Sequence, residues 1–211
     1  MDLKIMLASG IAAYLYVISP GPAFLALFTL AASKGRGPGA RFICGHLVGD
    51  VTWGALAVAA IVGANQLGAT LFQALGFGCG AYLVYLGWRA VTTKRDAPPQ
   101  AIGAARPLLT GLAFGLTNPK AYPVALAMFS AIVAPYVDKL SLADAPRLMA
   151  AAFIGFLAAD ATLIFAAGLA PVRRFFLTHG LIVTRVVGVM FIAFGVRSIW
   201  EAGSGLAARR P

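Results

Sequence analysis

Residues 3–32 read LKIMLASGIAAYLYVISPGPAFLALFTLAA. An α-helix needs about 20 apolar residues to cross a hydrocarbon core of roughly 30 Å, so this run is long enough to span a membrane. Its two prolines, Pro20 and Pro22, lie near the middle of the run and predict a tilted or interrupted helix. The chain start lacks the basic region of a signal peptide beyond Lys4, and we therefore expect a retained helix.

Comparable apolar runs recur along the chain. Hydrophobic residues make up 60% of its 211 residues and charged residues 11%, which is more apolar surface than a soluble fold of this size can cover. We predict an all-α integral membrane protein whose partner is the lipid bilayer. Its six transmembrane helices are expected at about 3–32, 41–63, 68–90, 108–134, 148–171 and 181–200.

The basic residues lie between the apolar runs and set the expected orientation. A net charge of +10 would suggest nucleic-acid binding in a soluble protein, but no basic helix face with stacking aromatics accompanies it, so we expect no nucleic-acid partner. Basic residues favour the cytoplasmic side, which places both termini outside, on the periplasmic side of a bacterial inner membrane. Loops one, three and five carry Lys34, Arg36, Arg41, Arg89, Lys94, Arg95, Arg106, Arg173 and Arg174.

The two halves of the chain share an ordered pattern. Gly45 and Asp50 match Gly155 and Asp160 at an offset of 110, and Gly80, Gly87 and Arg89 match Gly188, Gly195 and Arg197 at an offset of 108. Halves with an odd number of spans must be inverted relative to each other, as in many secondary transporters. We predict one membrane domain with three-helix repeats at 1–91 and 108–200, a cytoplasmic linker at 92–107 and a polar tail at 201–211.

Two proline motifs are the candidate substrate-binding residues: Pro20, Gly21 and Pro22 in the first span, and Asn118, Pro119 and Lys120 in the fourth. Each proline removes an amide donor, and Pro119 thereby frees the carbonyl of Gly115. Free carbonyls suit an ammonium group, and a half-helix N-terminus suits a carboxylate. The alternatives are a structural kink and, for Lys120, an internal ion pair that only holds helices together.

Asp50, Asp160 and His46 are the candidate proton-coupling residues. A carboxylate within a span either pairs with Lys120 or takes up a proton, because desolvation disfavours its charged form. His46 lies one turn before Asp50 on the same helix face, so the two could share a proton. The alternative for His46 is a packed interior histidine.

The remaining polar and small residues favour structural roles. Gly45 with Gly49 and Gly111 with Gly115 allow close helix packing, within one chain or across a homodimer. Cys44 and Cys79 are expected to be buried and inert. We find no catalytic motif and expect no enzyme activity, cofactor or metal site. Trp53, Trp88, Trp200, Tyr85 and Tyr136 are expected to anchor the helices at the membrane interface.

The chain resembles the LysE/RhtB family of bacterial amino-acid exporters. The resemblance rests on Pro20-Gly21-Pro22, on the glycine-spaced second span that ends in Gly49-Asp50, and on Asn118-Pro119-Lys120. It implies that the solute is an amino acid or a derivative, exported at the expense of the proton gradient. Ala121-Tyr122-Pro123 departs from the plainer apolar run that usually follows the second motif.

Three other functions stay open at this point. The two aspartates could be ligands in a divalent cation exporter, although hard cations take about six or more oxygens. Cys44, Cys79 and His46 could serve an intramembrane enzyme or electron carrier. The chain could also be an assembly subunit that transports nothing.

Overall fold

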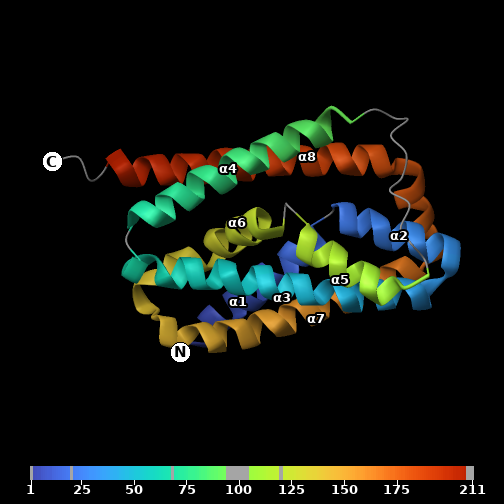
Figure 1. Ribbon diagram of the computed structural model, residues 1–211, viewed down its shortest axis with the longest axis horizontal. Coiled ribbons are helices and arrows are strands. Elements are labelled where there is room, and N and C mark those ends of the chain that lie inside the picture. The colour runs from blue at the N-terminus through green and yellow to red at the C-terminus, as the bar shows by residue number, and fades with distance from the viewer. Residues whose placement is uncertain (1, 20, 68, 94–104, 119–120, 208–211) are drawn as a thin grey trace.

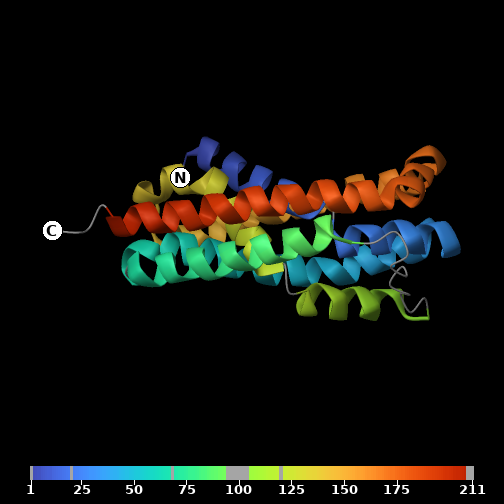
Figure 2. The same cartoon turned by 90° about the horizontal axis from the view of Figure 1, so that it is seen from above.

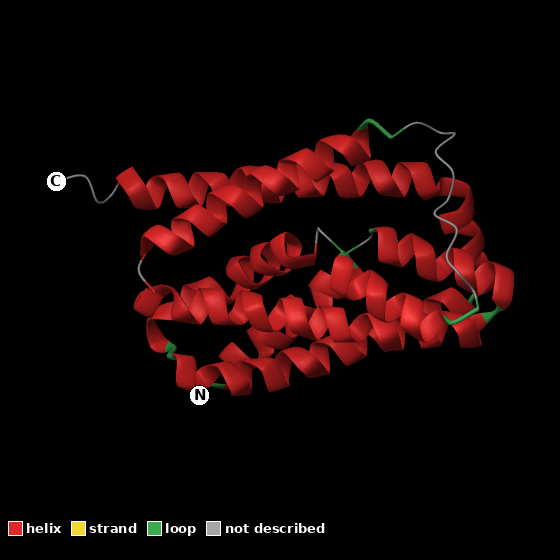
Figure 3. Ribbon diagram, viewed as in Figure 1, coloured by secondary structure: helices red, strands yellow, loops and turns green. Residues whose placement is uncertain are grey.

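All regular elements of the described residues are helices, as a computed structural model of residues 2–19, 21–67, 69–93, 105–118 and 121–207 shows (Figure 3). The predicted all-α class is therefore confirmed. The α-helices are α1 (Leu3–Ile18), α2 (Pro22–Lys34), α3 (Arg36–Leu67), α4 (Ala69–Val91), α5 (Pro107–Thr117), α6 (Ala121–Val133), α7 (Ala145–Gly168) and α8 (Ala170–Ala207). Two short 3-10 helices, η1 (Ala134–Lys139) and η2 (Leu142–Asp144), connect α6 to α7.

The first and fourth apolar runs are both interrupted, as their prolines predict. The first run forms α1 and α2, which are bent by 59° relative to each other. Gly21 precedes α2, and Pro22 is its first residue, where the missing amide hydrogen costs nothing. The fourth run forms α5 and α6. Pro20, Pro119 and Lys120 lie outside the described residues.

Several helices are long and apolar enough to cross a membrane. Three stretches of the described chain meet this test, Arg36–Gly63, Leu142–Gly168 and Thr178–Ser204, and the bent pair of α1 and α2 adds a fourth. The helices α5 and α6 are shorter apolar helices. By length and composition, three to four spans are thus supported.

The structure differs from the sequence prediction at two helix starts. Residues 36–40 form the first turns of α3, because a proline at position 38 is tolerated at the start of a helix. Residues 171–180 were expected to be a loop but belong to α8, which is kinked at His179 (φ −108°, ψ 15°). Only Gly35, with a φ of 89°, separates α2 from α3. At the other end, α8 continues to Ala207.

The helices lie along one long axis (Figure 1). The first run, α4 and α7 point one way, and α3, the fourth run and α8 point the opposite way. The described chain ends, at α1 and at the end of α8, lie at the same end of the bundle. We call this the termini end. The other end, where α2 ends at Lys34, α3 begins at Arg36 and α8 begins near Arg173, is called the basic end. Figure 2 confirms that α4 and α8 stay side by side when the molecule is turned.

Large apolar side chains cover the outside of the bundle. On α8 the exposed positions include Ile182, Val186 and Val189, each more than half exposed, and on α7 they include Ile154 at 69%. A soluble protein rarely exposes continuous apolar faces of this kind, whereas lipid requires them.

Glycines allow the buried helices to touch backbone to backbone. A Cβ atom at Gly45 would collide with the carbonyl oxygen of Leu108, and one at Gly111 with that of Phe42. Gly49 and Gly115 meet at the same crossing of α3 and α5. The predicted close-packing role is confirmed, and these contacts lie within a single chain.

The buried apolar side chains of the described residues form two clusters. The first, the termini-end cluster, includes Ala12, Ile61, Phe129 and Phe156. The second, the basic-end cluster, includes Leu27, Phe28, Phe42 and Leu163. Val17, at the end of α1, packs against both clusters. The zone between the clusters therefore coincides with the break in the first run.

Candidate functional site

A small cavity lies where the two helix breaks meet. Its volume is about 30 Å³, which is room for about two water molecules rather than an amino acid. The cavity brings together the predicted residues Gly21, His46, Asp50 and Asn118. The full described lining is Tyr16, Val17, Ser19, Gly21, Ala23, Phe24, His46, Asp50, Asn118, Ala121 and Val124.

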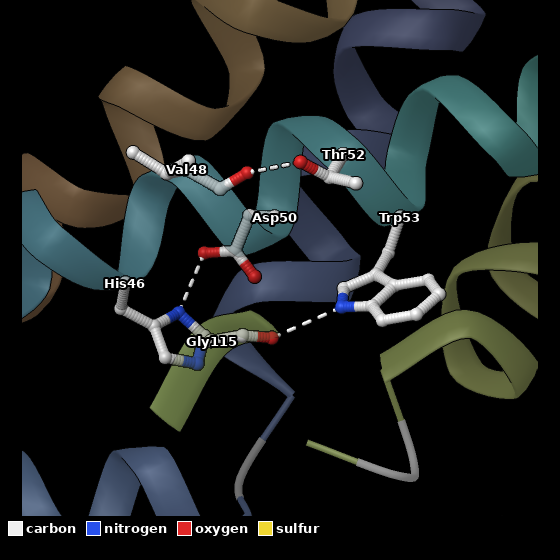
Figure 4. Close-up of polar contacts among 6 residues, drawn as sticks. All are labelled: His46, Val48, Asp50, Thr52, Trp53 and Gly115. Carbon is white, nitrogen blue, oxygen red and sulfur yellow. Dashed lines mark hydrogen bonds and ion pairs between the residues drawn. The ribbon is translucent and has the colours of Figure 1, made fainter. Parts of the chain in front are cut away.

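His46 and Asp50 form a buried pair in this lining (Figure 4). The Nδ1 atom of His46 lies 2.8 Å from Oδ2 of Asp50, and an ionised carboxylate accepts this hydrogen bond from the imidazole. Asp50 is 2% exposed and His46 is 8% exposed. The predicted contact across one helical turn is confirmed.

Two buried polar atoms in the lining have no hydrogen-bond partner among the described residues: Oγ of Ser19 and Nε2 of His46. Buried polar atoms are almost always paired with protein or water. Both atoms line the same cavity, so their hydrogen-bonding capacity is directed to one place.

The broken first run turns the ends of both its halves toward the cavity. Ser19 caps α1 with a bond from its amide to the carbonyl of Leu15, which leaves the last carbonyls of α1 outside the helical ladder. At the start of α2 the amides of Ala23 and Phe24 have no acceptor within the helix. The cavity is therefore lined by residues from a carbonyl-rich helix end and from an amide-rich one.

Comparison with known proteins decides the family. Residues 14–201 match the LysE type translocator family. The chain belongs to this family. No curated protein and no solved structure matches it. Family membership and the apolar helices together show that this translocator is a multi-pass membrane transporter. The family resemblance that was based on its proline motifs is therefore confirmed.

At the second helix break of the translocator, a free backbone carbonyl is hydrogen-bonded by a residue that was not predicted from the sequence. The carbonyl of Gly115, which Pro119 leaves without its helical donor, accepts a hydrogen bond of 3.0 Å from Nε1 of Trp53 (Figure 4). Trp53 is half-buried in the middle of α3, so its expected role as an interface anchor is wrong. Trp88 and Trp200 are exposed, at 64% and 76%.

Replacing Trp53 by Phe is expected to destabilise the translocator. The substitution keeps an aromatic ring but leaves the Gly115 carbonyl without its donor, which costs about 1–2 kcal/mol for an unsatisfied group between membrane helices. Thermal unfolding in detergent measures the effect, with Trp88→Phe on the exposed face as the control. Equal unfolding midpoints for the two variants would mean that the bond contributes nothing.

Two polar side chains of the cavity lining were not predicted from the sequence. Tyr16, 7% exposed, interacts with the carboxylate of Asp50, and Ser19 contributes the unpartnered hydroxyl. The only sequence signal is their distance from Pro20, because Ser19 directly precedes it and Tyr16 lies one helical turn earlier. A hydroxyl at a helix break is a candidate for lining whatever the break exposes.

Asp160 stands apart from the cavity. It is buried in α7 at 6% exposure, and its Oδ1 atom has no hydrogen-bond partner among the described residues. It does not line the cavity. The second predicted carboxylate thus lies on α7, whereas the His46–Asp50 pair lies on α3.

The cysteines and potential metal ligands need one correction. Cys44 is exposed on α3 rather than buried, and Cys79 is partly exposed; both are free thiols. Within the described residues, no group of three or more His, Cys, Asp and Glu side chains comes together.

Proposed function

We propose that the translocator is a secondary transporter that exports an amino acid or a derivative in exchange for protons across a bacterial inner membrane. The observation that carries this proposal is the cavity between the two helix breaks, where unpartnered Ser19 and His46 atoms lie beside both kinds of helix end. A zwitterion is the small solute that matches this lining, because it needs carbonyls for its ammonium group and amides for its carboxylate.

The substrate site uses both breaks. The end of α1 receives the ammonium group, and the start of α2 at Gly21 and Pro22 receives the carboxylate. Asn118, 8% exposed, adds an amide from the other break. Pro20, Pro119 and the counter-charge of Lys120 belong to the same proposal and lie outside the described residues.

The protons use the His46–Asp50 pair. An imidazole and a carboxylate 2.8 Å apart can hold one proton between them and release it when the solute arrives. Asp160 is the second titratable group on this route, one helix further from the solute. Exchange follows if the pair binds its proton only when the cavity holds no substrate.

Six spans in two inverted three-helix repeats complete the proposal, and the glycine contacts support it. A Cβ at Gly80 would lie 2.8 Å from the carbonyl oxygen of Gly195, and one at Gly188 would lie 2.7 Å from that of Gly87. At the offset of 108, Gly80 corresponds to Gly188 and Gly87 corresponds to Gly195. The two contacts are therefore equivalent, as a twofold relation between the halves requires.

A second pair of crossings follows the same relation. Gly45 in α3 meets a carbonyl of α5, and its counterpart Gly155 in α7 meets the carbonyl of Gly10 in α1. The opposite directions of matching helices in Figure 1 agree with inverted halves. The repeats are 1–91 and 108–200, joined by a cytoplasmic linker at 92–107 and followed by a tail at 201–211.

The orientation rests on charge. The basic end carries Lys34, Arg36, Arg106 and Arg173, so it faces the cytoplasm and both chain ends face the periplasm. The two apolar clusters then act as gates. The basic-end cluster separates the cavity from the cytoplasm, the termini-end cluster separates it from the periplasm, and each must open in turn to admit a solute larger than the closed cavity.

Efflux from proteoliposomes tests the function. Vesicles are loaded with single radiolabelled amino acids, and the outside is made more acidic than the lumen. At least one amino acid is expected to leave faster than from protein-free vesicles, because inward proton flow drives its export. Movement of divalent cations without any amino acid would replace the proposal by a cation exporter, and absence of any flux would favour an assembly subunit.

A further inference from the structure

The first segment of α8, residues 170–179, is set off from the rest of that helix. Non-helical backbone angles at His179 mark the kink, and Figure 1 shows the orange segment turned across the basic end of the bundle. Figure 2 shows the same segment standing out from the line of α8. It precedes most of Thr178–Ser204, the stretch of α8 that is long and apolar enough to cross a membrane.

The two faces of this segment differ. On the inner face, the ring of Phe176 packs 4.8 Å from that of Phe24 and 4.6 Å from that of Phe28, which fixes the segment to α2. On the outer face an open groove of about 570 Å³ is lined by Ala170, Pro171, Arg174, Phe175, Thr178 and His179. Every described residue that lines the groove belongs to this segment.

Charge around the groove is of one sign. Arg174 is exposed, and no described carboxylate lies within ion-pair distance of it. Apart from Asp50 and Asp160, the described acidic residues belong to parts of the chain at the termini end: Asp2 before α1, Asp138 in η1, Asp144 in η2 and Glu201 near the end of α8. Asp96 lies outside the described residues. The basic end thus presents an arginine that has no described protein counter-ion.

We propose that this groove binds the phosphate headgroup of an anionic phospholipid from the leaflet at the basic end. A guanidinium group binds a phosphodiester through two parallel hydrogen bonds, and the Thr178 hydroxyl and His179 ring supply further donors on the same face. Phe175 lies beside Arg174 and is 52% exposed. Its ring would contact the acyl chains of the bound lipid while Arg174 holds the phosphate, as in other interfacial residues.

The inference concerns a different surface from the transport cavity and does not depend on the exported solute. It has one structural consequence for that cavity. The segment that carries Arg174 also holds Phe176 against Phe24, and Phe24 lines the cavity. A lipid bound in the groove would therefore contact the segment that packs against a lining residue of the cavity.

Lipid retention by the full-length protein tests the proposal. The protein is purified in a neutral detergent, given equal amounts of phosphatidylglycerol and phosphatidylcholine, and analysed by native mass spectrometry. The wild type is expected to retain phosphatidylglycerol preferentially, and Arg174→Gln is expected to weaken that retention about fivefold, as for one arginine near an anionic surface. Arg174→Lys, which keeps the charge without the planar fork, is expected to fall between the two.

Arg147→Gln is the matched control, because Arg147 is an exposed arginine at the termini end. It should leave retention unchanged. Equal retention by Arg174→Gln and the wild type, with both eluting as the same sharp peak in size-exclusion chromatography, would overturn the proposal. So would binding of free inorganic phosphate at Arg174 without any preference for the anionic lipid.

Discussion

Gly111→Leu is expected to yield no monodisperse protein. Even a Cβ atom at this position would overlap the carbonyl oxygen of Phe42 on α3. Overpacking costs about 1–3 kcal/mol where side chains can shift, and here the obstacle is backbone, so α5 must move away from α3. That movement would also separate Trp53 from the carbonyl of Gly115. Size-exclusion chromatography of the detergent extract, followed by a thermal scan, measures the result.

Gly78→Leu is the matched control, because nothing lies within 4 Å of a Cβ at Gly78, which also lies within a helix. It should elute like the wild type. Its unfolding temperature should equal that of the wild type or be slightly higher, because glycine disfavours the helical conformation. Gly155→Leu, at the crossing of α7 and α1, should fail like Gly111→Leu. A sharp peak and a wild-type unfolding midpoint for Gly111→Leu would contradict the described crossing.

Asp50→Asn is expected to lower gradient-driven efflux by at least tenfold while leaving the fold intact. Asparagine has almost the same shape as aspartate and can still accept a hydrogen bond from Nδ1 of His46, so the buried contact persists. It cannot take up and release a proton, and the gradient then has nothing to act on. The assay compares initial efflux with and without an acidic exterior at equal amounts of reconstituted protein.

Asp138→Asn controls for loss of a carboxylate, because Asp138 is exposed near the termini end. It should transport like the wild type. Asp50→Glu restores a titratable group one methylene further out and should recover part of the gradient dependence. Full gradient-driven efflux by Asp50→Asn would remove Asp50 from the proton route and leave Asp160 as the carboxylate to test.

The helix breaks were predictable because a proline acts locally. Pro20 and Pro22 identify the interruption between α1 and α2 from the sequence alone, and Pro119 correctly identifies Gly115 as a carbonyl that needs a new partner. The partner itself was not predictable. Trp53 comes from 62 residues away in sequence, and its distance from Gly115 depends on how closely Gly49 allows α3 to approach α5.

In the candidate site, too, the local contact was predictable and the long-range contacts were not. The contact between His46 and Asp50 spans one helical turn, so helix periodicity is enough to predict it. Tyr16 and Ser19 join them only because α1 ends beside α3, which is a matter of tertiary packing. The predicted start of the last helix was wrong for a related reason. Residues 171–180 read as a polar loop, yet a helix can continue past the hydrocarbon core when Phe176 finds a buried neighbour.

Proton movement driven by the solute alone tests the central claim most directly. Vesicles loaded with the exported amino acid start at equal pH on both sides, with valinomycin and equal potassium to remove any membrane potential, and a trapped dye reports the lumenal pH. Because coupling is reciprocal, outward amino-acid flow is expected to acidify the lumen with the wild-type protein and not with Asp50→Asn. Amino-acid efflux at the full rate with an unchanged lumenal pH would contradict proton exchange.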